Sequence, residues 1–221
     1  MLVKEVKRFF VFLLTFLILS YPISLQAKAY TSSDVVISKE ILLDPIRYVP
    51  HYDFGDTSVL HMNHALYSWN EATGKWLLSR DPNNVHFDIV FPNQTPIGES
   101  DPEYGDHNNY VYHNVNSNWR YKGLNVTYVQ KGITYTGNYN VKYEIITESD
   151  ININMYHKWA NSAQPGAYDL WSVFLHESGH TIGLGDRTSP KSAVMYEDID
   201  ANTEKRELTA LDLYNVDYIY G

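Results

Sequence analysis

Residues 176–186 read His-Glu-Ser-Gly-His-Thr-Ile-Gly-Leu-Gly-Asp, and no other stretch of the chain says as much about its fold. Two histidines, His176 and His180, stand four positions apart, a spacing that places both side chains on one face of a helix. Imidazoles in that arrangement can bind one metal ion, and the carboxylate of Glu177 can accept a proton from a water at that ion. The motif therefore predicts a metal site with its own general base.

The third metal ligand has to come from outside the helix. A catalytic zinc ion usually takes three protein ligands and one water, and no histidine follows His180. Asp186 comes six residues after His180, and Gly183 allows a sharp turn that would bring its carboxylate back to the metal. We therefore predict one zinc ion held by two histidines and Asp186. The alternative third ligand is a downstream glutamate, Glu204 or Glu207.

Composition limits the class of protein. The chain has 221 residues and no cysteine, which excludes disulfides, thiolate ligands and thiol catalysis. A basic start, an apolar run at 9–19 and small residues at 27–29 are typical of a secretory signal peptide, the run being short for a membrane anchor. Removing residues 1–29 takes away four basic residues and one acid, so the formal charge falls from −9 to −12. Nucleic acid and membrane are not expected as partners, and we expect a secreted, extracellular monomer.

Hydrophobic periodicity predicts three helices. Apolar residues spaced by three and four indicate a helix over residues 58–70, with its N-cap at Asp56 or Thr57 and its end at Gly74. A second helix is expected over 168–184, and a short final one after Thr209, whose spacing to Asp212 resembles a capping box. The first helix also carries His61 and His64, which are expected to be surface or packing residues.

Alternation of apolar and polar residues predicts several strands. They are expected at 86–91, 124–129, 133–135, 141–146 and 151–155, with a hairpin turn at Gly137-Asn138. The stretch from 92 to 122 has no period and is expected to form long loops. Two acidic clusters are compatible with structural calcium, although solvated loops are the favoured interpretation because neither cluster has fixed ligand spacing. The clusters are Asp101, Glu103 and Asp106, and Asp198 with Asp200.

The motif at 176–186 resembles the signature of the metzincin metallopeptidases, and its flanks resemble the matrixin branch. Residues 170–175 are similar to the helix that leads into matrixin sites, 192–196 resemble the methionine turn, and 212–221 resemble the C-terminal helix. The resemblance implies an α+β fold: a twisted mixed sheet with a backing helix and an active-site helix, then a small irregular subdomain that ends in a helix. One domain is expected over 30–221, with subdomains of about 30–184 and 185–221.

The same resemblance implies a secreted zinc metalloendopeptidase. Met195 would form a floor under the metal, and Tyr196 would line the specificity pocket, although core packing accounts for Tyr196 equally well. Asp186 departs from matrixins, which usually have a third histidine there, and resembles the aspartate of snapalysin-like secreted peptidases. Without cysteine, the familiar cysteine latch of matrixins is also missing.

The expected substrate is a protein or peptide in an extended conformation, paired with an edge strand of the sheet. By analogy with the family, residues 152–155 are expected to be that edge, with Asn152 and Asn154 as substrate-binding positions. The competing function is a secreted binding or surface protein on an inactive peptidase fold. Such proteins usually lose the glutamate or a histidine of the motif, and this chain keeps Glu177 and both histidines.

Overall fold

The computed structural model describes residues 40–42, 44–85, 87, 108–115, 117, 119, 121–136 and 139–221 of the chain. Four predicted features lie outside these residues: the signal peptide, most of the strand at 86–91, the turn at Gly137-Asn138 and the first acidic cluster. Within the described residues, no helix has both the length and the apolar character that crossing a membrane requires.

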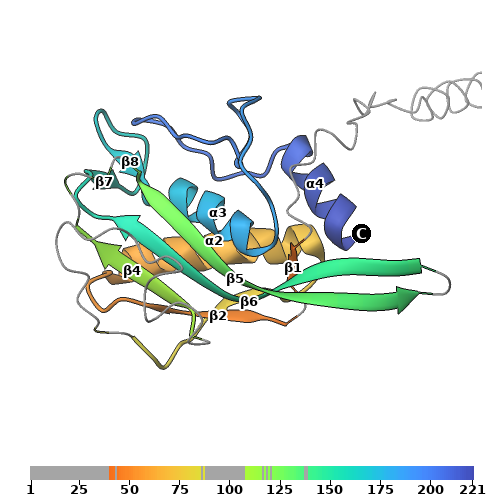
Figure 1. The fold of residues 1–221 in the computed structure, drawn as a ribbon. Coiled ribbons are helices and arrows are strands. Elements are labelled where there is room, and N and C mark those ends of the chain that lie inside the picture. The colour runs from red at the N-terminus through yellow and green to blue at the C-terminus, as the bar shows by residue number, and fades with distance from the viewer. Residues whose placement is uncertain are drawn as a thin grey trace, which may run out of the picture. The chain divides into compact units, whose positions relative to one another are not determined.

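A six-stranded mixed sheet forms the centre of the fold (Figure 1). Its strands, in spatial order, are β1 (Glu40–Leu42), β6 (Tyr139–Asn154), β4 (Tyr110–Asn114), β2 (Ile46–Pro50) and β3 (Leu78–Arg80), and β5 (Gly123–Thr136) pairs with β6. The pairings are parallel except that of β5, which runs antiparallel to β6. A separate parallel pair consists of β7 (Trp159–Ala160) and β8 (Tyr168–Asp169).

The edge of this sheet is β5 and not the strand expected from the sequence. On one side β6 pairs with β5, and on the other it pairs with β1 and β4. Asn152, for example, has Leu124 as its partner in β5 and Tyr112 as its partner in β4. The prediction of an edge at 152–155 is therefore wrong. The sequence of a strand does not show which of its two sides are paired, because the pairing partners are segments far away in the chain.

The described residues form three helices: α2 (Asp56–Thr73), α3 (Leu170–Thr181) and α4 (Ala210–Tyr220). Helices α2 and α3 pack together against the sheet (Figure 1). Trp69 of α2 is fully buried and donates its indole N–H to the backbone carbonyl of Leu175 in α3 at 2.8 Å. Apolar side chains of both helices and of the central strands share one core, so α2 is the expected backing helix and the predicted α+β fold is confirmed.

Helix boundaries follow local capping chemistry. The N-cap of α2 is Gly55 without a side-chain hydrogen bond, so the predicted cap at Asp56 or Thr57 is wrong by one or two positions. Its end is Gly74, as predicted, with a left-handed φ of 62° that glycine adopts without strain. The α3 helix is shorter than predicted, because the Asp169 side chain accepts a hydrogen bond from the backbone of Ser172 and starts the helix at Leu170.

One strand lies where the sequence indicated only loops. Residues 110–114 form β4, which is paired on both sides, with β2 and with β6. Val111, Tyr112 and Asn114 are all buried, so both faces of this strand are covered. A strand buried on both faces has no need to alternate polar and apolar residues, which explains why the period was absent.

A buried hydrogen-bond network joins α3 to three strands. The hydroxyl of Tyr48 in β2 lies 2.8 Å from Ser149 Oγ in β6 and 2.5 Å from Thr181 Oγ1 in α3. Asn125 of β5 donates to Thr181 Oγ1 at 2.8 Å and to the backbone carbonyl of Glu177 at 2.8 Å. Removing one partner of a buried hydrogen bond lowers the stability of the folded protein. This network therefore fixes the position of α3.

Tyr48→Phe should lower the free energy of unfolding by about 1–3 kcal/mol, because Ser149 and Thr181 each lose a buried partner. The measurement is urea denaturation followed by circular dichroism, and the m-value should stay the same. Tyr218→Phe is the control, since Tyr218 is 55% exposed. Equal stability of the two variants would show that the network does not hold the helix.

Candidate metal centre and cleft

The two histidines of the motif and Asp186 converge at the end of α3. His176 and His180 lie one turn apart on the helix, and their Nε2 atoms are 3.2 Å and 3.4 Å from the same oxygen, Oδ1 of Asp186. Ligands that bind a tetrahedral zinc ion with bonds of about 2.0–2.1 Å lie about 3.3 Å from each other. The spacing of these donors therefore fits a single zinc ion.

Hydrogen bonds from the opposite ring nitrogens orient both imidazoles. Nδ1 of His176 lies 2.9 Å from the backbone carbonyl of Val194, and Nδ1 of His180 lies 2.7 Å from that of Leu184. A carbonyl oxygen can only accept, so each Nδ1 carries a proton, and the lone pair of the neutral ring is then on Nε2. Metal-bound histidines usually have such a second partner. In their neutral form, both imidazoles are thus held in the tautomer that presents Nε2 to a metal.

Gly183 allows the chain to turn back behind α3. Its φ is 88°, in the left-handed region that side chains with a Cβ rarely adopt. The backbone N–H groups of Gly183 and Leu184 donate to the carbonyls of His180 and Gly179, which closes the end of the helix. This turn places the carboxylate of Asp186 beside the two histidines.

Met195 packs beneath the helix that carries the histidines. It is fully buried, and a Cβ built on Gly179 of α3 would collide with its sulfur and with the ring of Trp69. Asp212 at the start of α4 accepts hydrogen bonds from the backbone N–H groups of Val194 and Met195, at 3.1 Å and 3.3 Å. The segment around Met195 is therefore fixed from both sides, by α3 and by Asp212.

Glu177 is buried next to the donors. It is 6% exposed, and its carboxyl group lies against Gly123, at the start of the edge strand β5. Burial raises the pKa of Glu177, and Asp186 adds to this, while His176 and His180 act in the opposite direction. A carboxylate whose pKa is raised toward neutrality is suited to accept a proton and to return it.

The three donors together form a site for positive charge. Hydrogen bonds from His176 and His180 hold the pKa of Asp186 well below its usual range. Burial opposes a charge on His180, but the hydrogen bond and charge of Asp186, with the charge of Glu177, outweigh it and raise the pKa of His180. Protons and a metal ion would therefore compete for the same nitrogens.

A cleft of about 430 Å³ contains this group of residues. Gly123, Leu124 and Asn125 of β5 line one side, and the segment from Tyr196 to Ile199 lines the other. Among the described strands, none pairs with the outer side of β5. The cleft thus lies between the donors and a strand edge that can accept another strand.

Three charged residues line this cleft, and the sequence had indicated only one of them, Asp198, as part of an acidic cluster. Lys122, just before β5, forms an ion pair with Asp198 at 2.7 Å, and Lys205 donates to the backbone carbonyl of Asp198. All three line the cleft. They come from segments far apart in the chain without any common motif, so only the fold brings them together.

The structure places the other candidate residues away from the donors or in other roles. Asn152 and Asn154 are fully buried on the interior strand β6, so the prediction that they pair with substrate is wrong. His61 and His64 pack on the ring of Trp171, with centroids 5.6 Å and 4.7 Å from it.

The alternative ligands are not near the two histidines. Glu204 accepts a hydrogen bond from the backbone N–H of Ala163. Over the described part of the chain, the group of potential ligands around His176 and His180 contains Asp186 and neither Glu204 nor Glu207. Calcium is not supported, because Asp198 and Asp200 belong to no potential metal-binding group there.

The sequence pattern of the matrixin family matches residues 131–221, which is less than half of the chain. Metalloendoproteinase 1-MMP of Arabidopsis thaliana is 47% identical over 55 residues, which are 25% of this chain and 15% of the plant protein. Metalloendoproteinase 1 of Glycine max is 42% identical over 55 residues, 25% of this chain and 18% of that protein. The match thus spans less than a fifth of the length of these relatives.

Among solved structures, the chain has a loose similarity to high choriolytic enzyme 1, a hatching-enzyme zinc-protease of the medaka Oryzias latipes. The TM-score is 0.38 with 10% sequence identity, over 86% of this chain and 92% of the other. The sequence matches, and not this low structural similarity, define the relationship. They confirm that the chain resembles the metzincin metallopeptidases, and that residues 131–221 resemble the matrixin family.

Proposed function

We propose that this chain is a secreted zinc-dependent endopeptidase that hydrolyses peptide bonds of substrates bound in an extended conformation. The observation that carries the proposal is the convergence of His176, His180 and Asp186 beside Glu177, in a cleft bounded by the edge strand β5. The resemblance to matrixins supports the same reaction.

The three donors would hold the zinc ion. When bound, the ion would supply Lewis acidity, which makes water a better nucleophile near neutral pH and polarises a carbonyl group. The carboxylate donor Asp186 is harder than imidazole, and it lowers the preference for zinc over other divalent ions relative to a site with three histidines. Met195 would support the donors from below without binding the metal.

Glu177 would move the proton. Its carboxylate would accept a proton from the attacking water and then pass it to the amine of the departing peptide. Burial against Gly123 keeps the carboxylate away from bulk water and close to the donors. The outer backbone edge of β5 would pair with the substrate, and Tyr196 on the opposite side of the cleft would contact the substrate's side chains.

The competing function, a binding or surface protein without activity, would need fewer structural features than an enzyme. It does not require a general base, a turn that delivers a third ligand, or imidazoles fixed with Nε2 toward the carboxylate. The chain has a glutamate buried beside the histidines, a left-handed turn at Gly183 and imidazoles whose Nδ1 atoms lie against backbone carbonyls. They favour the enzyme, and the two variants below separate these functions.

Glu177→Gln should reduce cleavage of a quenched peptide library by about 10²–10⁴-fold, the usual contribution of a general base. Zinc content by mass spectrometry should equal that of the parent chain, because Glu177 is not a ligand. Glu207→Gln serves as the control, since Glu207 is exposed, and should retain full activity. Activity in Glu177→Gln equal to the parent would contradict the assignment of the base, and a parent without chelator-sensitive cleavage would favour the binding protein.

Asp186→Ala should hold one equivalent of zinc less than the parent after dialysis, since two imidazoles remain where three donors were present. We expect a loss of affinity beyond the roughly 10–100-fold cost of removing an outer-shell partner. Glu204→Gln tests the alternative ligand and should keep its zinc. The assignment fails if Asp186→Ala holds as much zinc as the parent while Glu204→Gln or Glu207→Gln holds one equivalent less.

A further inference from the structure

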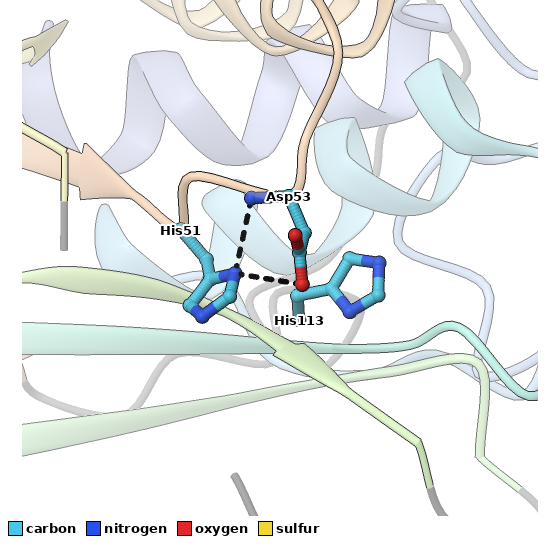
Figure 2. A group of neighbouring side chains, drawn as sticks. All are labelled: His51, Asp53 and His113. Atoms are coloured by element: carbon cyan, nitrogen blue, oxygen red, sulfur yellow. Dashed lines mark hydrogen bonds and ion pairs between the residues drawn. The ribbon is translucent and has the colours of Figure 1, made fainter. Parts of the chain in front are cut away.

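A second group of potential metal ligands lies at the carboxyl ends of two neighbouring parallel strands. His51 directly follows β2, Asp53 is in the turn between β2 and α2, and His113 lies on β4 (Figure 2). One donor atom from each residue lies within 4.8 Å of the other two. None of the three belongs to α3 or to the cleft, so this group is separate from the site of the proposed peptidase.

The distance between His51 and Asp53 suits a shared ion better than a direct hydrogen bond. Nδ1 of His51 and Oδ2 of Asp53 are 3.7 Å apart, which exceeds the 2.7–3.2 Å of an N–H···O bond. Two ligands on a tetrahedral zinc ion would lie about 3.3 Å apart, so a shift of a few tenths of an ångström would bring both into position. The donors around His176 and His180 in the same structure show comparable separations of 3.2 Å and 3.4 Å.

The protonation state of His51 also suits a ligand. The backbone N–H of Asp53 donates to Nδ1 of His51 at 3.2 Å (Figure 2). A nitrogen that accepts a hydrogen bond carries a lone pair and no proton. The same lone pair could bind a metal, and this long hydrogen bond is the contact that a metal would replace.

Aromatic neighbours hold the two imidazoles. The rings of His51 and His113 stack with centroids 5.7 Å apart and planes 28° apart. Phe54 packs its ring against His113 at 5.2 Å, and Tyr52 packs against His51 at 4.6 Å. His51 is 5% exposed, whereas the side chain of Asp53 is 44% exposed. The two imidazoles are thus held by aromatic side chains, and the carboxylate of Asp53 faces solvent.

We propose that His51, Asp53 and His113 bind a second transition-metal ion, with zinc as the expected occupant. Two imidazoles and one carboxylate suit zinc, copper or nickel, whereas calcium and magnesium prefer oxygen ligands alone. Solvent on the side of Asp53 would provide the fourth ligand. The ion would tie the turn that precedes α2 to strand β4, two segments about 60 residues apart in the chain, and its effect would be on stability.

Metal counting on the purified chain tests this proposal. After removal of metal with a chelator and reloading with zinc, the parent should hold two equivalents by mass spectrometry. His113→Ala and Asp53→Ala should each hold one. The control His64→Ala changes a histidine that packs on Trp171 outside both groups, and it should hold two.

A combination of variants assigns each equivalent to its site. His180→Ala should hold one equivalent, and His113→Ala with His180→Ala should hold none. Cobalt in place of zinc should give the His180→Ala variant the absorption bands of a tetrahedral ion, and these bands should disappear when Asp53→Ala is added. Calcium should not substitute in either measurement.

Thermal denaturation provides a readout that is independent of activity. Added zinc should raise the melting temperature of His180→Ala, where only the second site remains, and should leave His180→Ala with Asp53→Ala unchanged. The side chain of Asp53 is exposed, so Asp53→Ala should leave the core intact. This variant therefore tests the site even if His113→Ala fails to fold. Equal zinc content in the parent and in Asp53→Ala would overturn the proposal.

Discussion

The position of α3 is the constraint on which the site depends. Thr181 and the backbone of Glu177 are hydrogen-bonded to Tyr48 and Asn125, and Gly179 lies against Met195 and Trp69 with no room for a Cβ. A shift or rotation of the helix would break buried hydrogen bonds on one side or cause a collision on the other. The two histidines are consequently held to the accuracy that metal binding requires.

Buried carboxylates connect distant segments of this chain, which has no cysteine and hence no disulfides. Asp212 caps α4 and also binds the backbone of Val194 and Met195, so one side chain connects the final helix to the irregular segment below the site. Asp169 starts α3 and pairs with Arg206 from the same irregular segment. Each of these acids satisfies several donors at once, which compensates for removing the charge from water.

Local chemistry accounts for what could be predicted about the fold and the site. The spacing of His176 and His180, the turn at Gly183 and the capping box of Thr209 and Asp212 each depend on residues within a few positions of one another, and the structure has them as the sequence indicated. Helix α2 was recognised because its apolar face repeats along a single segment. Its N-cap and the start of α3 were misplaced by one or two residues, because several neighbouring polar residues can cap a helix.

Pairing between distant segments accounts for what could not be predicted. Asn152 has the alternation of a half-exposed strand, yet β4 and β5 lie on both of its sides, and no local pattern contains that information. His51 and His113 likewise meet only because β2 and β4 are neighbours. The sequence by itself determined the two histidines proposed as donors, the glutamate proposed as base and the helix that carries all three, since one helical turn defines their geometry. Only the tertiary structure decided which strand forms the edge of the cleft and which other histidines come together, because both depend on the order of strands in the sheet.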